Sequence, residues 1–236
     1  MQQHDWNVTL TPKEAIELQK QLKDEVRLVP LGREPSLIGG ADVSMNRFAK
    51  EGFAGFVALS FPELRLVDHS VVKSTIPFPY VPGLLSFREI PMLLRAWEKL
   101  ETKPEVLVVD GIGIAHPRRL GIASHLGLVL GIPTIGCAKS VLTGIYDEPG
   151  NEPGDTAPLT DPRTKEVIGM ALRTKAKVKP VFVSPGHLIT LEESVELVRR
   201  CVMRHRLPEP TRLAHNTVNE YRLRDLSHQS ELGGAA

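Results

Sequence analysis

Three acidic residues occur where a carboxylate would destabilise the fold unless it had a partner. Asp42 lies within an apolar strand candidate at residues 37–44, Asp110 directly follows another apolar strand candidate, and Glu89 precedes a helix candidate. A carboxylate in such a setting must be paired or bind a cation. Because oxygen ligands without cysteine suit hard cations, the three acids point to Mg²⁺ or Mn²⁺ rather than Zn²⁺.

Each acid also has a purely structural explanation. Asp110 is followed by Gly111, so it could simply cap a turn. Ser86 and Glu89 match a helix-capping box. Pro91 would then be the fifth residue of that helix, where its missing N–H removes an intrahelical hydrogen bond, and this weakens the capping explanation. Asp42, inside a strand, is the acid that is hardest to explain by stability alone.

The hydrophobic pattern predicts the elements that would position these acids. Residues 37–44, 53–61 and 64–74 are rich in apolar and β-branched side chains and are separated by short turns, which predicts an antiparallel meander of three strands. The further candidates are helices at 12–24, 92–100 and 120–130 and strands at 106–110, 133–138, 167–172 and 181–184. Their alternation predicts a parallel half-sheet. Parallel strands place their carboxyl ends at one edge, so Asp42 and Asp110 are expected to converge there.

The remaining signals concern the ends of the chain and its loops. A capping box at Thr11 begins the first helix, and Thr190 caps a later amphipathic helix. Residues 146–163, rich in Gly, Pro, Asp and Glu, are expected to form a long surface loop. Residues 227–236 are expected to be a disordered tail. No composition break divides the chain, so a single domain spanning residues 1–236 is expected.

Composition excludes several classes of protein. The 236 residues carry a formal net charge of +1, so no global field indicates a nucleic-acid partner, and any such partner must be recognised by local patches. The two cysteines, Cys137 and Cys201, predict neither a disulfide framework nor a zinc cluster, and they favour a reducing compartment. No apolar run approaches the length of a membrane span and no apolar leader follows Met1, so a cytoplasmic protein without membrane contact is expected.

The order of strands, helices and acids is similar to that of the ribonuclease H superfamily. That resemblance implies an α/β fold in which a mixed sheet, a three-strand antiparallel meander plus parallel strands, is flanked by helices. It also implies two-metal phosphodiester hydrolysis. A dinucleotide-binding alternative rests on Gly111 and Gly113 after a strand, but His116 and Pro117 occupy the place of the third glycine, so the phosphate-binding fingerprint fails.

Longer motifs resemble one family within that superfamily. Residues 79–89 (PYVPGLLSFRE) carry a proline-stiffened tyrosine directly before Glu89, and residues 110–125 (DGIGIAHPRRLGIASH) carry adjacent arginines and several glycines. The match continues through the segments PTIGCAK at 133–139, GH at 186–187 and RLPEPTR at 206–212. Together these segments resemble the endonuclease V family, nucleases directed at deoxyinosine, over most of the chain.

The resemblance implies a role for each matching residue. Asp42, Glu89 and Asp110 would bind the metal and act in catalysis, with His215 at a fourth position that carries Asp or His in the family. Tyr80, with Pro79, Val81 and Pro82, would form a wedge that separates the strands. The pocket for the flipped base would be shaped by Gly83, Leu85, Gly111, Gly113, Gly121 and Ile122. Phosphate contacts would come from His116, Lys139, Arg118 and Arg119.

The resemblance also implies a reaction. Family members use Mg²⁺, which Mn²⁺ can replace, to cut the second phosphodiester bond 3′ to hypoxanthine, leaving a 3′-hydroxyl and a 5′-phosphate. The expected partner is inosine-containing DNA, with inosine-containing RNA as an alternative, and the expected state is a monomer. Two other functions stay open at this point: a nucleic-acid-binding relative without catalysis, and a metal-dependent phosphotransfer enzyme for small nucleotides.

One segment of the nearly neutral chain is basic. Between residues 165 and 206, nine lysines and arginines face four glutamates. The basic residues are Lys165, Arg173, Lys175, Lys177, Lys179, Arg199, Arg200, Arg204 and Arg206. A basic band would give salt-sensitive phosphate contacts that do not depend on sequence, and a solvated protein face would explain the same residues equally well.

Overall fold

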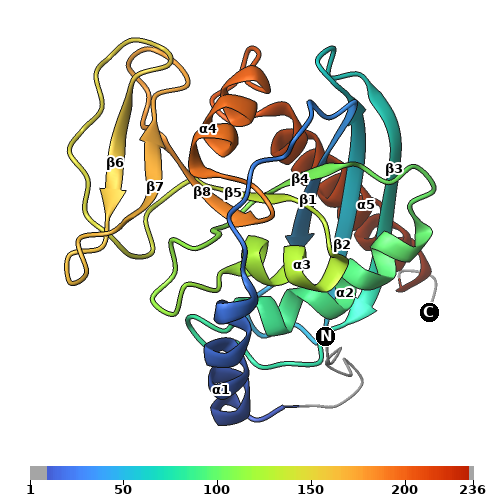
Figure 1. The fold of residues 1–236 in the computed structure, drawn as a ribbon. Coiled ribbons are helices and arrows are strands. Elements are labelled where there is room, and N and C mark those ends of the chain that lie inside the picture. Colours follow the sequence, from blue (N-terminus) through green and yellow to red (C-terminus); the bar gives the residue numbers. More distant parts are fainter. Residues whose placement is uncertain (1–9, 234–236) are drawn as a thin grey trace.

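One mixed sheet organises the part of the chain that the structure describes (Figure 1). The computed structural model describes the backbone of residues 10–233 and side chains as far as residue 227. The strands are β1 (Leu37–Ser44), β2 (Glu51–Ser60), β3 (Leu66–Thr75), β4 (Val106–Val109), β5 (Thr134–Ala138), β6 (Thr156–Thr160), β7 (Val167–Leu172) and β8 (Val181–His187). The helices are α1 (Pro12–Leu22), the 3-10 helix η1 (Lys23–Glu25), α2 (Leu85–Lys99), α3 (Ile122–Leu130), α4 (Leu191–Arg200) and α5 (Glu209–Gly233).

The strand order is β3-β2-β1-β4-β5-β8-β7-β6. β1, β2 and β3 form an antiparallel meander, and β1 pairs in parallel with β4, which pairs in parallel with β5. β8, β7 and β6 extend the sheet in antiparallel fashion. The predicted meander and parallel half-sheet are therefore confirmed.

Successive side chains of each central strand point to opposite faces of the sheet, and both faces are apolar. Helices therefore cover both faces. On one face, Ile38 of β1 and Val106 and Val108 of β4 pack with side chains of α4 and α5. On the other face, Leu107 and Val109 pack with side chains of α2 and α3. Figure 1 shows α2 and α3 together beside the central strands. The central strands are therefore buried on both sides, and only their ends are open to a substrate.

The start of α5 lies against β1 without room for a side chain between them. A Cβ atom added at Gly40 would lie 1.9 Å from the carbonyl oxygen of Pro210. Ala214 and Val218, one and two turns further along α5, are fully buried. This close approach brings the first half of α5 next to the carboxyl end of β1.

Local capping signals set the first turns of α1 and α4. Thr11 and Thr190 each accept a hydrogen bond from the backbone N–H three residues later, and the glutamates at those positions return the bond. Both predicted capping boxes are confirmed. The predicted helix at 12–24 ends as an α-helix at Leu22 and continues as the 3-10 helix η1.

α2 begins earlier than expected and contains a proline. It starts at Leu85 and runs through Pro91, so Glu89 lies inside the helix and not before it. Ser86 is a buried helical residue, and the capping box proposed for it does not form. Proline inside a helix removes one backbone hydrogen bond. Ile90 and Met92, on either side of Pro91, are fully buried, and we infer that this packing outweighs the local cost.

One more prediction was wrong in the C-terminal half of the chain. The segment 146–163, expected to be a loop, contains the edge strand β6, in which Pro158 occupies an exposed position suited to a sheet edge. The backbone of α5 extends to Gly233, into the segment 227–236 that was expected to be a disordered tail, and residues 234–236 lie outside the described chain. The later turns of α5 are mostly polar, so the sequence shows no apolar periodicity there. Across residues 10–233, the structure has no helix that combines the length and apolar character of a membrane span.

Candidate active site

The sheet brings the predicted acids together at the carboxyl ends of β1 and β4. β1 and β4 are parallel neighbours with Gly40 opposite Val108, and the Asp110 N–H donates to the Ala41 carbonyl at 3.3 Å. Alternation along each strand directs Asp42 and Asp110 toward the face covered by α5. One ligand atom from each of Asp42, Asp110 and His215 lies within 4.8 Å of the other two.

Glu89 completes this group from the opposite layer. It reaches the site from α2, and it lines a cavity of about 180 Å³ together with Asp42 and Asp110. The four residues predicted to be catalytic therefore come from β1, α2, the end of β4 and α5, and the fold places them in one cluster. We call Asp42, Glu89, Asp110 and His215 the carboxylate cluster.

The positive charge around the cluster is too small to keep all of its carboxylates ionised. Burial, with the nearby charges of Asp42 and Asp110, raises the pKa of Glu89 to about 8. Burial and the charge of Asp110 raise the pKa of Asp42 to about 6, although His215 and Lys139 act in the opposite direction. Three acids at such proximity favour protonation unless a cation neutralises them.

Lys139 supplies one positive charge at the edge of the cluster. Its Nζ donates to Asp110 Oδ2 at 2.5 Å. Arg206 fixes the backbone next to it, since its guanidinium donates to the carbonyls of Lys139 at 3.0 Å and Pro180 at 2.7 Å. The predicted phosphate-binding lysine therefore lies at the end of β5, beside the carboxylate cluster.

His215 is held by a chain of hydrogen bonds along α5. Its Nδ1 lies 3.0 Å from Asp42 Oδ2, and its Nε2 lies 3.1 Å from Asn219 Nδ2. Asn219 accepts from Ser44 Oγ at 2.8 Å, which orients its amide so that Nδ2 donates to His215. Nε2 then accepts, so the Nδ1–H of neutral His215 donates to Asp42.

A second cavity, of about 320 Å³, opens beside the cluster. Nine residues predicted from the resemblance line it: Tyr80, Val81, Pro82, Gly83, Leu85, Gly111, His116, Gly121 and Ile122. Further lining residues, none of which was predicted to belong to the pocket, are Gln19, Ser86, Ile112, Leu120, Ser140 and Leu142. Asp110 lines both cavities, so the pocket and the carboxylate cluster share a wall.

The loop at Gly83 is fixed by an unusual concentration of donors. Gly83 has φ 77°, a conformation that favours glycine, and its carbonyl lies 2.7 Å from Arg118 Nη2. Gln19 Nε2 and His116 Nε2 each lie 3.1 Å from the same oxygen. Burial, together with the charges of Arg118 and Arg119, lowers the pKa of His116 to about 4. His116 is therefore neutral and serves the shape of the pocket.

Gln19 is the main pocket residue that sequence reasoning missed. It is 1% exposed, accepts from Arg118 Nε at 2.5 Å and also donates to the Leu120 carbonyl at 3.2 Å. A signal was present, because Gln19 stands four residues after the buried Ala15 and hence on the inward face of α1. A polar side chain at such a position needs buried partners.

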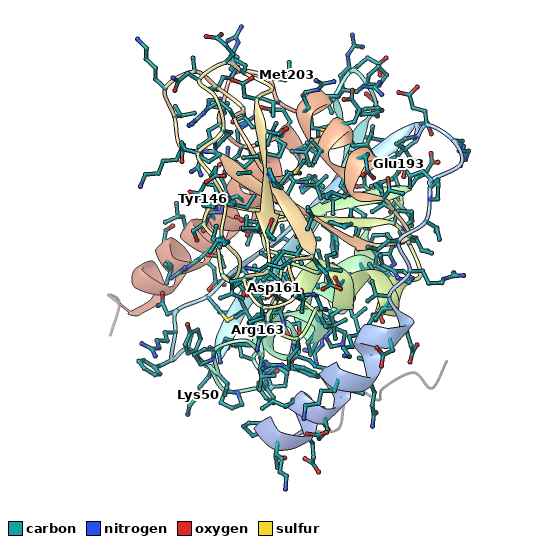
Figure 2. All side chains as sticks on the ribbon, turned by 60° about the vertical axis from the view of Figure 1, so that its left-hand side comes forward. Lys50, Tyr146, Asp161, Arg163, Glu193 and Met203 are labelled. Atoms are coloured by element: carbon teal, nitrogen blue, oxygen red, sulfur yellow. The ribbon has the colours of Figure 1, made fainter. Side chains whose placement is uncertain are left out.

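The other predicted binding residues lie around the pocket and do not line it. Gly113 packs against the loop after β8, where an added Cβ would lie 2.0 Å from the Pro185 carbonyl oxygen. Arg119 is ion-paired with Asp161 at 2.8 Å and with Glu166 at 3.0 Å. Both acids belong to the β6–β7 turn, and Asp161 is labelled in Figure 2. Pro79 is exposed beside Tyr80. These contacts link Gly113 and Arg119 to neighbouring loops.

Arg88, next to Glu89, was also missed as a structural residue. It is 4% exposed and donates to the carbonyls of Phe78 at 2.7 Å and Arg47 at 3.0 Å. Its guanidinium therefore joins the loop before α2 to the β1–β2 turn.

The predicted basic band is less continuous than its composition indicates. Arg173 is buried, pairs with Glu148 at 2.6 Å and donates to several backbone carbonyls. Arg199 pairs with Glu196, and Arg200 pairs with Glu34. Exposed positive residues are found at Lys165, Lys177, Lys179 and Arg204.

Comparisons with known proteins point to one family. The family profile of endonuclease V matches residues 20–216. Endonuclease V of Myxococcus xanthus is 49% identical over 93% of this chain and 92% of its own length. The crystal structure of endonuclease V from Streptomyces avermitilis superimposes with a TM-score of 0.86 at 39% identity, covering 92% of this chain and 95% of that one.

A structure of a relative with bound nucleic acid extends the comparison. Endonuclease V of Ciona intestinalis, in complex with a 24mer DNA containing an inosine followed by a ribo-adenosine, has a TM-score of 0.78 at 28% identity, covering 91% of this chain and 98% of that one. The profile covers the residues of the carboxylate cluster, from Asp42 to His215. The chain belongs to the endonuclease V family.

Proposed function

We propose that this protein is a metal-dependent endonuclease that takes inosine into the pocket and hydrolyses the second phosphodiester bond 3′ to it, leaving 3′-hydroxyl and 5′-phosphate ends. The observation that carries the proposal is the shared wall: Asp110 lines both the pocket and the cavity of the carboxylate cluster. A base held in the pocket therefore has its backbone beside the acids. The Ciona relative, which holds inosine-containing DNA, supports the choice of base.

The donor set of the cluster fits a divalent cation. Asp42, Glu89 and Asp110 offer carboxylate oxygens, which Mg²⁺ and Mn²⁺ prefer, and no cysteine is among the lining residues. The raised pKa of Glu89 reflects the same excess of negative charge that a cation would neutralise. A bound cation would polarise phosphate oxygens and water.

Protein side chains supply the remaining chemistry in this proposal. Lys139, held against Asp110, is placed to offset phosphate charge next to the carboxylates. His215 holds its Nδ1 proton toward Asp42 and is open to solvent, so it can orient Asp42 and exchange protons with the substrate side. Tyr80, 43% exposed at the rim of the pocket, fits a wedge that fills the place of the extruded base.

Base selection is proposed to depend on pocket shape and backbone groups. Gly83, Gly111 and Gly121 line the pocket without side chains, which leaves backbone groups accessible to the edge of a base. Hypoxanthine lacks the exocyclic amine of guanine and carries oxygen where adenine carries an amine. A close-fitting pocket with backbone donors can therefore select hypoxanthine.

Strand cleavage of matched oligonucleotides tests the function. Single-stranded and duplex DNA with one deoxyinosine should be cut in Mg²⁺ at the second 3′ phosphodiester, and the deoxyguanosine control should not. Asp42→Ala should lower the rate by at least about 10²-fold because it removes a metal-binding carboxylate. Asp147→Ala, an exposed acid in the β5–β6 connection, should cleave like the wild type.

Other outcomes would identify other functions. Binding of inosine-containing strands without cleavage in Mg²⁺ or Mn²⁺ would indicate a binding-only relative. Hydrolysis of small nucleotides, with no preference for polymers and no effect of Tyr80→Ala, would indicate a phosphotransfer enzyme. An inosine-containing RNA of the same sequence, cut faster than the DNA, would make RNA the preferred substrate.

The proposed setting is a monomer in the cytoplasm. Every ligand candidate of the cluster comes from one chain, so a single copy suffices for the site. Cys137 and Cys201 are buried free thiols, which agrees with a reducing compartment.

A further inference from the structure

The turn between β1 and β2, residues 45–50, exposes an aromatic ring that the fold does not use. Phe48 is 87% exposed at this turn. A single exposed apolar side chain is ordinary on a protein surface. Phe48 differs because its neighbour Arg47 also contacts Tyr80, the rim residue of the base pocket.

The contact between the two segments is a stack of a cation and two rings. The Arg47 guanidinium carbon lies 4.6 Å from the centre of the Tyr80 ring and 5.4 Å from the centre of the Phe48 ring. Both distances are within the range of cation–π attraction. Tyr80, Arg47 and Phe48 therefore form one surface that begins at the pocket and extends away from it.

Buried hydrogen bonds hold the turn in place. Arg88 donates to the Arg47 carbonyl at 3.0 Å and to the Phe78 carbonyl at 2.7 Å, so one guanidinium fixes both the turn and the loop that carries Tyr80. From α5, Arg222 Nη2 donates to Asn46 Oδ1 at 2.7 Å. The turn is therefore anchored to the elements that carry Glu89 and His215.

The turn is also positively charged. Arg47 and Lys50 are both exposed, and Lys50 lies at the periphery of the molecule in Figure 2. Aromatic rings on which bases stack, combined with cations beside the backbone, form the usual surface for unpaired nucleic acid. An aromatic ring offers its face to any base, so such a surface requires no particular sequence.

We propose that the β1–β2 turn is a second contact surface for the nucleic-acid substrate, on which Phe48 stacks against an unpaired nucleobase flanking the inosine and Arg47 contacts the adjacent phosphate. This proposal rests on the proposed function, because it assigns an occupant to the surface that continues from the pocket rim. Tyr80 takes the place of the extruded base, and Phe48 stacks on a flanking base that the wedge has separated from its pairing partner.

The turn is tested separately by measuring binding in the presence of Mg²⁺. The Asp42→Ala background is used because it prevents cleavage during the measurement. The probes are single-stranded and duplex oligonucleotides with one deoxyinosine or one deoxyguanosine. Phe48→Ala should weaken binding of the inosine probes by about tenfold, the usual effect of losing one base-stacking ring. Phe48→Trp should restore it. Leu66→Ala, at an exposed apolar position on the edge strand β3, is the matched control and should bind normally.

Salt dependence separates the two side chains of the turn. Arg47→Ala should reduce the slope of log K against log salt by about 0.7 to 0.9, as expected for one phosphate contact. Phe48→Ala should leave that slope unchanged. Thermal unfolding of both variants should match the parent, because these side chains are exposed.

Two failures are distinguishable. If the Asp42→Ala protein itself does not prefer inosine probes, the proposed function fails. If it prefers them and Phe48→Ala binds equally well, the turn proposal alone is overturned. A concentration-dependent dimer that Phe48→Ala abolishes in sedimentation would assign the ring to a contact between copies, and it would also overturn the proposal.

Discussion

At the residue scale, the shape of the pocket depends on buried polar side chains. Gln19 joins the Gly83 carbonyl, the Leu120 carbonyl and the Arg118 guanidinium in one buried network. A carbonyl oxygen that loses a buried donor must stay unsatisfied or draw another group toward it. The position of the pocket wall at Gly83 and Leu120 therefore depends on these hydrogen bonds.

Gln19→Leu tests the network. It keeps the size of the side chain and removes the hydrogen bonds to Gly83, Leu120 and Arg118, so the free energy of unfolding should fall by about 1–3 kcal/mol. The loop at Gly83 should also hold the base less firmly, which would raise the KM for inosine substrates more than it lowers kcat. Urea unfolding and steady-state cleavage measure the two effects.

Gln21→Leu is the control for this substitution, because Gln21 is exposed on the same helix. It should leave both unfolding and KM unchanged. Equal behaviour of Gln19→Leu and Gln21→Leu would contradict a positioning role for Gln19.

At the element scale, the contact of α5 with β1 joins His215 to Asp42. Gly40 lies two residues before Asp42, and its missing side chain permits the Pro210 carbonyl to approach the strand. His215 lies five residues after Pro210, so the height and rotation of the helix at Pro210 fix the position of the imidazole. A small displacement of α5 therefore separates His215 from Asp42.

Gly40→Ala should show this dependence. The added Cβ would meet the backbone at 1.9 Å, so the helix must move, and overpacking of this kind costs about 1–3 kcal/mol of stability. The cleavage rate should fall by more than the loss of folded protein explains, because the His215–Asp42 hydrogen bond is lost even in molecules that stay folded. Cleavage rates below the unfolding transition give the comparison.

Gly52→Ala provides a graded control for this element. An added Cβ there would lie 3.0 Å from Met45 Cβ and 3.4 Å from both the Met92 sulfur and the Ser44 carbonyl oxygen, so the neighbours must shift by only a few tenths of an ångström, far less than at Gly40. Activity should be close to that of the wild type. A Gly40→Ala protein as active as Gly52→Ala would show that α5 does not position His215.

At the scale of the whole molecule, the carboxylate cluster makes stability depend on pH and on metal. The folded protein raises the pKa of Glu89 to about 8 from an ordinary value of 4.5. Between these two pH values the folded state retains a proton that the unfolded state has lost. The free energy of unfolding therefore falls as the pH rises through this window, and the fall is complete above about pH 8.

The metal-free protein should consequently be less stable at pH 8.5 than at pH 6.5, by about 1–2 kcal/mol. Added Mg²⁺ should reverse the loss at pH 8.5, because a ligand that binds the folded state stabilises it. Urea unfolding at both pH values, in EDTA and in Mg²⁺, measures the four free energies. Glu89→Gln cannot titrate and should show a smaller change with pH. Equal stability of the metal-free wild type at both pH values would refute the assigned charge repulsion.

The local sequence determined much of the secondary structure. Capping signals at Thr11 and Thr190 correctly predicted where α1 and α4 begin, because a cap is satisfied by residues within one turn. The apolar strand runs predicted the meander and the parallel strands. Sequence failed where packing overrides local preference, as at Pro91 inside α2, or where a polar surface hides the periodicity, as along α5.

For function, the sequence by itself determined which side chains were available for catalysis and which motifs the chain shares with the endonuclease V family. Strand alternation and parallel pairing were enough to predict that Asp42 and Asp110 meet. Only the tertiary structure decided that Gln19 closes the pocket, that Arg119 pairs with Asp161, and that Arg47 links Phe48 to Tyr80. These contacts join segments far apart in the chain, and their partners are set by how helices and loops pack on the sheet, which local patterns do not encode.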